Sequence, residues 1–103
     1  MVISETSNLH PGEILAKNFL KPLGITAYRL SKDINIPQTR ISQIIKTRRR
    51  ITADTALRLS RYFGTTAKFW LGLQNIYDLK REAILNAEEL AIIPKINLSN
   101  LRE

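Results

Sequence analysis

Amide, hydroxyl and basic side chains are concentrated in residues 36–51, IPQTRISQIIKTRRRI. A glutamine can bind the edge of adenine through two hydrogen bonds, a threonine can offer its hydroxyl or methyl group, and an arginine can bind guanine or a phosphate. Gln38, Thr39 and Gln43 are therefore predicted to read base edges. The residues predicted to bind the sugar-phosphate backbone are all basic: Arg40, Lys46, Arg48, Arg49 and Arg50.

The positive charge of the chain is large and local. The net charge is +7 and the isoelectric point is near 10.2, which favours a polyanionic partner such as nucleic acid or an anionic membrane. Residues 36–53 hold five bases and no acid, whereas residues 74–103 hold four bases and five acids. A basic loop alone is often only a solvated surface, and a membrane-binding helix would carry Lys opposite Trp or Leu. The amides and threonine before the loop favour duplex DNA over both alternatives.

The other reactive side chains do not make a catalytic or metal-binding pattern. His10 and Glu13 lie one helical turn apart, but the chain has one histidine and no cysteine, so a zinc site would need carboxylates that no pattern supplies. Ser42 has no second histidine to act as its base, and the four glycines form no phosphate-binding loop. We predict no enzymatic activity, no metal site and no cofactor. The alternative from another functional class is a ribonuclease that uses His10.

Two short helices and a tight turn are predicted to position the polar and basic residues. Thr26 is a suitable N-cap for the first helix, whose apolar residues share one face: Ala27, Leu30 and Ile34. Residues 35–37 should end that helix, because asparagine tolerates the left-handed conformation and proline disfavours a helical residue before it. A helix over 37–45 then turns its isoleucines inward and its polar side chains outward. This arrangement is a helix-turn-helix.

Helices are also predicted on both sides of this motif. One should begin near Pro11 and stop before Pro22 and Gly24, and another should lie between Thr52 and Gly64. A fifth should follow Thr65 or Thr66, and it is apolar over more than one face, which suggests a partner beyond the core. Residues of this helix predicted to lie in a dimer interface are Phe69, Trp70 and Leu73.

The length and composition limit the remaining possibilities. A chain of 103 residues fits one domain, the absence of cysteine favours a reducing compartment, and no apolar run approaches the about 20 residues that a membrane span needs. We therefore expect an all-α protein of the cytoplasm that does not enter a membrane. The expected division is a flexible segment over 1–9, a DNA-binding domain over 10–82 and a partly helical or mobile extension over 83–103.

Three segments resemble a known family. HPGEIL at 10–15, RISQIIKTRRRITADTALRLSRYFGT at 40–65 and FWLGLQNIYDL at 69–79 closely resemble the HigA (VapI) antitoxins, within the xenobiotic-response-element class of helix-turn-helix proteins. The resemblance covers residues 8–82. It implies a five-helix, lambda-repressor-like domain that forms a homodimer and represses its own operon by binding a palindromic operator.

The resemblance also implies a protein partner and residue roles. The partner would be a HigB toxin, a small ribonuclease that cuts messenger RNA on the ribosome and is neutralised by direct binding. Gln38, Thr39 and Gln43 match the family's base-reading positions, Arg40 matches a phosphate contact, and residues 46–50 match the backbone-binding loop. Asn35 departs from the glycine common in the turn of the larger class. A repressor without a toxin partner stays open as the alternative.

Overall fold

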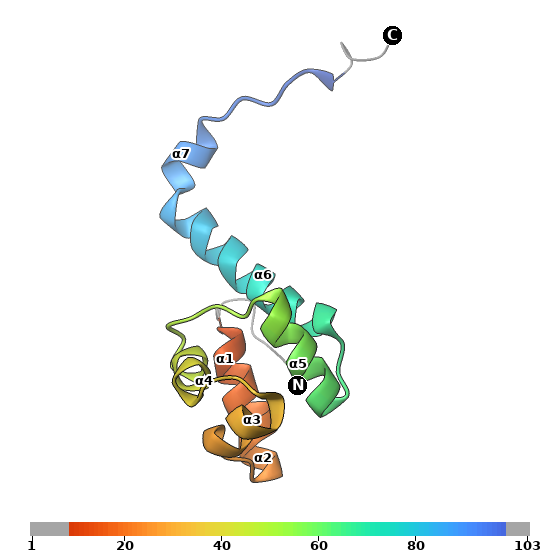
Figure 1. The fold of residues 1–103 in the computed structure, drawn as a ribbon. Coiled ribbons are helices and arrows are strands. Elements are labelled where there is room, and N and C mark those ends of the chain that lie inside the picture. The colour runs from red at the N-terminus through yellow and green to blue at the C-terminus, as the bar shows by residue number, and fades with distance from the viewer. Residues whose placement is uncertain (1–8, 99–103) are drawn as a thin grey trace.

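The computed structural model describes residues 9–98, and every regular element in this range is a helix (Figure 1). The predicted all-α, lambda-repressor-like helix-turn-helix fold is confirmed. The first long helix consists of three consecutive segments, α1 (Pro11–Ile14), η1 (Leu15–Leu20) and α2 (Lys21–Leu23). The helices that follow are α3 (Ala27–Ile34), α4 (Gln38–Ile45), α5 (Ala53–Phe63), α6 (Ala67–Leu85) and α7 (Ala87–Ala91).

The first helix begins at the predicted residue but continues past its predicted end. Pro11 occupies the first helical position, and the chain stays helical through Pro22 to Leu23, so the prediction of an end before Pro22 was wrong. In an α-helix, a proline ring clashes with the carbonyl four residues earlier. The preceding segment η1 is a π-helix, in which Lys21 N–H donates to the carbonyl of Ala16, five residues back. This wider turn lets the helix accept the proline, and Gly24, with a φ of 66°, ends it.

Threonines begin two of the later helices by capping them. Thr26 Oγ1 accepts a hydrogen bond from Arg29 N–H at 3.0 Å, and Thr66 Oγ1 accepts one from Phe69 N–H at 3.0 Å. The sequence left open whether Thr65 or Thr66 caps α6, and the structure shows that Thr66 does. Thr65 instead accepts a hydrogen bond from the indole Nε1–H of Trp70 at 2.7 Å. The two threonines thus fix both the start of α6 and the side chain that α6 inserts into the core.

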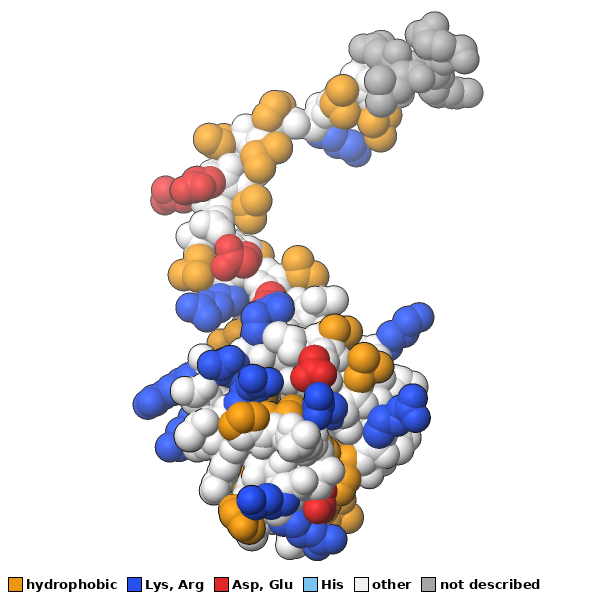
Figure 2. Space-filling model, viewed as in Figure 1, with side chains coloured by type: hydrophobic (Ala, Val, Ile, Leu, Met, Phe, Trp, Pro, Cys, Tyr) orange, Lys and Arg blue, Asp and Glu red, His pale blue; other side chains and the backbone are white. Residues whose placement is uncertain are grey.

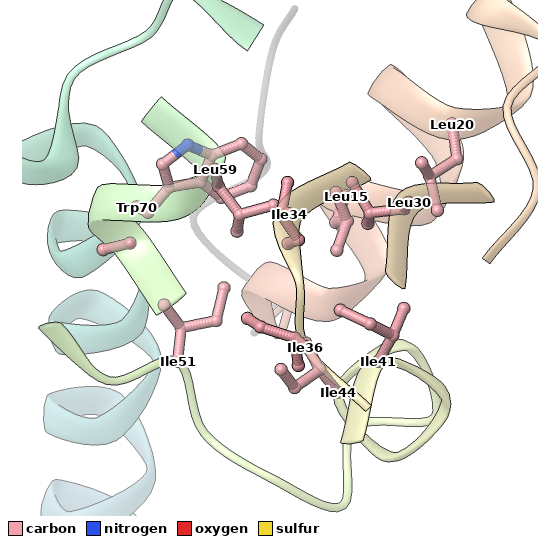
Figure 3. Packing of buried hydrophobic residues seen from close by; sticks show 11 residues of the cluster. Leu15, Leu20, Leu30, Ile34, Ile36, Ile41, Ile44, Ile51, Leu59 and Trp70 are labelled. Atoms are coloured by element: carbon pink, nitrogen blue, oxygen red, sulfur yellow. The ribbon is translucent and has the colours of Figure 1, made fainter. Parts of the chain in front are cut away.

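The core lies between the helix-turn-helix and the helices that flank it. Figure 3 shows Ile36, Ile41 and Ile44 close together beside the first helix, with Trp70 and Leu59 on the other side of the cluster. Trp70 has no exposed surface. The prediction that it lies in a dimer interface is therefore wrong, because its own chain encloses it completely. Fully burying an aliphatic or aromatic side chain stabilises a fold by about 1.5–3 kcal/mol, so α4 is held from its inner face by its isoleucines.

The second half of α6 and all of α7 leave the compact part of the molecule (Figure 1). The described chain is accordingly elongated, with extents of 56 × 30 × 26 Å. α6 runs through Leu85 without a break, across the expected division at 82/83, and α7 restarts the helix after Asn86. The division into domains stays a prediction. Residues 1–8, where flexibility was predicted, lie outside the described residues, as do 99–103.

Candidate nucleic-acid interface

The turn between α3 and α4 is built as the sequence predicted. Asn35 adopts the left-handed conformation with a φ of 58° and ends α3, and Ile36, which is 3% exposed, anchors the turn in the core. A contact that the sequence did not reveal also holds the turn. Arg58 of α5 donates from Nη1 to the carbonyl oxygens of Ile34 at 2.9 Å and Asn35 at 3.2 Å. These are carbonyls that the end of a helix leaves without partners, so α5 fixes the angle between α3 and α4.

α4 presents the predicted base-reading residues on its outer face. The side chains of Gln38, Thr39 and Gln43 are exposed, while Ile41 and Ile44 are fully buried on the opposite face. Arg40, predicted to contact the backbone, is half-buried at the border of the two faces. The first turn of α4 contains no acidic residue, so the positive end of the helix dipole is not offset there. The helix thus exposes neutral hydrogen-bonding groups beside positive charge.

A close approach of two backbones fixes where the far end of α4 lies. A Cβ atom added to Gly12 would lie 1.7 Å from the carbonyl oxygen of Ile44. No side chain fits in that space, so glycine is required for α1 to pack against the end of α4. The start of α1 is itself held by His10, whose Nδ1 accepts a hydrogen bond from Gly12 N–H at 2.9 Å. His10 and Gly12 therefore act together to seat α4.

The basic loop, residues 46–50, follows α4 directly, and all five of its residues are exposed. It turns at Thr47, which has a φ of 62°, an uncommon value for a threonine that the sequence did not predict. Lys46 and Arg48 make no ion pair with any other residue in the range 9–98. Figure 2 shows blue Lys and Arg side chains over the body of the molecule, whereas orange and red ones are more prominent on the helices that leave it.

Two arginines of the basic loop have partners within the chain. Arg49 donates from Nε to Oε1 of Gln43 at 2.9 Å, so a residue predicted to bind the backbone touches one predicted to read bases. Arg50 forms an ion pair with Asp78 of α6, with 2.5 Å between Nη2 and Oδ2. The basic segment contains no acid of its own, but the fold brings one to it from 28 residues further along the chain. Sequence spacing gave no sign of this pairing.

Asp78 belongs to a small polar cluster on α6. Gln74, which is 2% exposed, donates from Nε2 to Oδ1 of Asp78 at 3.0 Å and accepts from the backbone N–H of Ile51 at 2.7 Å. Burial raises the pKa of the Asp78 carboxyl, but hydrogen bonds from Arg50 and Gln74 and the positive charge of Arg50 outweigh it, so the pKa lies below its usual value. Asp78 is accordingly a carboxylate at neutral pH.

The residues considered for catalysis have structural roles. His10 is 3% exposed and its ring packs edge-on against Tyr77, with 4.9 Å between ring centroids. Burial lowers the pKa of His10, while the charges of Asp78 and Glu13 oppose the shift. His10 is the N-cap of the first helix. Within residues 9–98 no group of three or more His, Asp or Glu side chains is placed to hold a metal ion.

The two other residues predicted for a dimer interface remain accessible. Phe69 is 37% exposed and Leu73 is half-buried, and both lie on the face of α6 that continues through Ile76 and Leu79. Ile76 is 55% exposed and Leu79 is 71% exposed. Among the helices described here, none has the length and apolar character needed to cross a lipid bilayer.

Comparisons with known proteins agree with this geometry. The family model for the helix-turn-helix matches residues 17–70. Virulence-associated protein I of Dichelobacter nodosus is 51% identical over 77 residues, which cover 75% of this chain and 71% of that protein. The sequence similarity thus extends over the helix-turn-helix and most of its supporting helices.

Two solved structures are similar over almost their whole length. The structure titled antitoxin HigA with the higBA promoter, from Pseudomonas aeruginosa, has a TM-score of 0.85 and 34% identity, and the match covers 88% of this chain and 100% of that one. An addiction module antidote protein of the HigA family from Coxiella burnetii has a TM-score of 0.83 and 39% identity, with 89% of this chain and 100% of that one covered. The similarity therefore includes α6 as well as the helix-turn-helix.

Proposed function

This chain belongs to the HigA/VapI antitoxins, within the xenobiotic-response-element class of helix-turn-helix proteins, and we propose that it binds a specific duplex DNA operator and represses its own operon. Proteins of this class are DNA-binding regulators and not enzymes, in agreement with the sequence analysis. Because its operator would lie on bacterial DNA, we expect the chain to act in the cytoplasm.

One observation supports this proposal most strongly. The outer face of α4 carries exposed Gln38, Thr39 and Gln43 directly before the exposed basic loop. In a helix-turn-helix the second helix enters the major groove with its first residues near base edges. The basic loop would then lie along the sugar-phosphate backbone and displace counterions, which supplies affinity without sequence preference. A surface that only contacts solvent would not need amide and hydroxyl side chains on the helix followed by basic side chains in the loop.

Titration of DNA tests the repressor proposal. The full chain is mixed with a duplex that carries the inverted repeat upstream of its own gene, and with a scrambled duplex of the same composition. We expect specific binding to be about 10³-fold or more tighter than binding to scrambled DNA, the lower end of the usual range for specific DNA-binding proteins. Equal affinity for the two duplexes would exclude sequence-specific repression.

We also propose that the chain acts as a homodimer. The exposed apolar face of α6 begins at Phe69 beside the compact part of the molecule, continues to Leu79 and is suited to contact the same face of a second copy. In dimeric helix-turn-helix proteins the two recognition helices read half-sites about 34–36 Å apart, one turn of the duplex, and we expect this spacing for the two α4 helices. The twofold symmetry matches the inverted repeat expected in the operator.

Neutralisation of a HigB-type toxin is the second part of the proposed function. It is supported by the antitoxin names of the similar structures. Surfaces outside the helix-turn-helix core are available for such a partner, and after Asn86 the chain exposes apolar side chains: Leu90, Ile92, Ile93, Ile96 and Leu98. A toxin that binds RNA would itself be basic, and Glu88 and Glu89 lie beside these residues.

Co-expression distinguishes an antitoxin from a stand-alone repressor. The product of the adjacent reading frame is tagged and purified, and both its retention of this chain and its cleavage of messenger RNA are measured. We expect the two proteins to co-purify and the chain to suppress cleavage. A neighbour that neither binds the chain nor cleaves RNA would leave the stand-alone repressor as the better description.

A further inference from the structure

A polar cluster on α6 holds the basic loop in place from outside the helix-turn-helix. The cluster consists of Gln74 and Asp78, which lie one turn apart on the face of α6 turned toward the loop. Gln74 binds the backbone N–H of Ile51, and Asp78 binds the guanidinium group of Arg50. Two consecutive residues at the end of the loop are thus tied to the same helix.

The contact through Gln74 is buried and engages both ends of its amide group. Gln74 is 2% exposed and Ile51 has no exposed surface. The amide oxygen of Gln74 accepts from Ile51, and its nitrogen donates to Asp78. Leaving either group without a partner in a buried position costs about 1–3 kcal/mol. The backbone at Ile51 is therefore held by a hydrogen bond to α6.

Arg50, one of the residues predicted to bind DNA, is paired with an acid of its own chain. Its guanidinium group is directed to Asp78 on α6, whereas Lys46 and Arg48 make no ion pair with a described residue. Charge-assisted hydrogen bonds of this kind are about twice as strong as neutral ones. An Arg50 that turned to a phosphate would leave the Asp78 carboxylate close to the DNA with reduced compensation.

We propose that Gln74 and Asp78 are positioning residues for DNA binding, and that Arg50 acts through Asp78 instead of contacting a phosphate. The inference rests on the proposed function, since it concerns the same DNA-binding surface. The path from α6 to the bases is short: Asp78 holds Arg50, the neighbouring Arg49 holds the amide oxygen of Gln43, and Gln43 lies on the base-reading face of α4. α6 therefore contributes to sequence discrimination without touching DNA.

The sign of one mutational effect separates this inference from simple electrostatics. Asp78 is a negative charge near a polyanion, so if charge were its whole contribution, its removal would strengthen binding to every duplex. If Asp78 positions the loop, its removal must weaken binding to the operator relative to scrambled DNA. The two explanations predict opposite changes in the same measurement.

The experiment uses the full chain with the two duplexes described above. For D78N we expect the ratio of operator affinity to scrambled affinity to fall about tenfold, the effect expected when a hydrogen bond to a charged group is lost. E82Q is the matched control, because it removes an equal charge from an exposed position of the same helix, one turn beyond Asp78, while keeping an oxygen for Asn86. It should leave the ratio unchanged.

The salt dependence of binding tests the role of Arg50. R50A should leave the slope of log affinity against log salt unchanged, whereas R48A, which removes a phosphate contact, should make it shallower by about 0.9. The double variant R50A/D78N should lose no more discrimination than D78N alone, because both changes break the same contact. Circular dichroism spectra identical to that of the unaltered chain establish that these surface variants are folded.

Four results would overturn the inference in different ways. Tighter binding of D78N to both duplexes would mean that Asp78 is only a repulsive charge. A slope for R50A as shallow as that for R48A would mean that Arg50 contacts a phosphate. If the unaltered chain prefers the operator and D78N keeps that preference, this inference alone fails. If the unaltered chain shows no preference, the proposed function fails and this inference with it.

Discussion

At the scale of single residues, Gln43 and Arg48 should affect DNA binding in different ways. Replacing Gln43 by Ala should cost about 1–3 kcal/mol on the operator and relax the preference at one base pair. Replacing Arg48 by Ala should weaken operator and scrambled DNA alike and reduce the salt slope by about 1. Fluorescence anisotropy titrations at several salt concentrations, on the operator and on single-base variants of it, measure both effects. Identical profiles for the two variants would contradict the division of roles.

Arg49 is expected to combine both effects, and the sequence alone could not predict this. As a basic loop residue it would only supply affinity, and its removal would weaken all sequences alike. The structure places its Nε 2.9 Å from the amide oxygen of Gln43, so it also orients a base-reading side chain. Arg49→Ala should therefore reduce the salt slope and the operator preference together in the same titrations. A loss of affinity with no change in preference would show that the contact with Gln43 has no role in the complex.

His10 should make stability depend on pH. Its Nδ1 must be unprotonated to accept from Gly12 N–H, and burial lowers its pKa in the folded chain. As the pH falls, the unfolded chain protonates this histidine near a pKa of about 6.5, before the folded chain does. The free energy of unfolding should therefore decrease between about pH 6.5 and the lower pKa of the folded chain. Chemical unfolding between about pH 7.5 and pH 5 measures this change in the free energy of unfolding.

Asparagine is the matched replacement for His10. It is a favourable N-cap and does not titrate, so His10→Asn should keep most of the stability at neutral pH and lose the dependence on pH in this range. Asp78, whose pKa is lowered from 3.8, stays charged throughout. A pH dependence that persists in His10→Asn would assign the effect to another group.

At the scale of elements, the packing of α1 against α4 should be intolerant of any side chain at residue 12. Gly12→Ala would bring a Cβ atom to 1.7 Å from the carbonyl oxygen of Ile44, so the two helices must separate. We expect a loss of stability of about 1–3 kcal/mol, the usual cost of overpacking a core, and weaker operator binding because the end of α4 moves.

Thermal unfolding with Gly72→Ala as control tests this. An added Cβ at Gly72 has no atom of the chain within 4 Å, and Ala is favoured over Gly inside a helix by about 0.8–1 kcal/mol. The two substitutions should therefore have opposite signs. A Gly12→Ala variant as stable as the unaltered chain would show that the approach of α1 to Ile44 relaxes without cost.

The elements themselves were largely predictable from local chemistry, and their contacts were not. The caps at His10 and Thr26 and the left-handed residues Asn35 and Gly64 mark helix ends because each acts on its own neighbours. The end predicted before Pro22 was wrong because the π-helical segment before the proline, which the sequence pattern did not indicate, lets the helix continue. The pairings of Arg50 with Asp78 and of Arg58 with the end of α3 join residues far apart in the sequence. Periodicity and spacing carry no information about such pairs.

The exposed polar face of α4 was predictable for a related reason. The positions of Gln38, Thr39 and Gln43 follow from the helical period once the isoleucines are assigned to the core, and the structure exposes all three. Trp70 could not be assigned in the same way. α6 is apolar on more than one face, so the sequence alone did not distinguish the face that meets the core from the face that meets a partner. Three-dimensional packing decides this, and it encloses Trp70 while leaving Leu79 exposed.

At the scale of the whole molecule, charge and apolar surface lie at different places. The basic loop and α4 lie on the compact body, and the exposed leucines and isoleucines continue along α6 and α7 as they leave it (Figures 1 and 2). An exposed apolar face of this length is unusual in a monomer and indicates a protein partner. A dimer formed there would keep the DNA-binding surfaces free while fixing the distance between them.

Leu79→Glu tests the dimer on this basis. Leu79 is 71% exposed, so a charge at this position should leave the fold of one chain intact and disfavour only a contact that buries it. Sedimentation should then report a monomer, and affinity for the full operator should fall much more than affinity for a single half-site. Leu57→Glu is the matched control, since Leu57 is 54% exposed but lies on α5 and not on α6. If Leu79→Glu sediments as the unaltered chain does, the two copies meet through another surface and the predicted half-site spacing no longer follows.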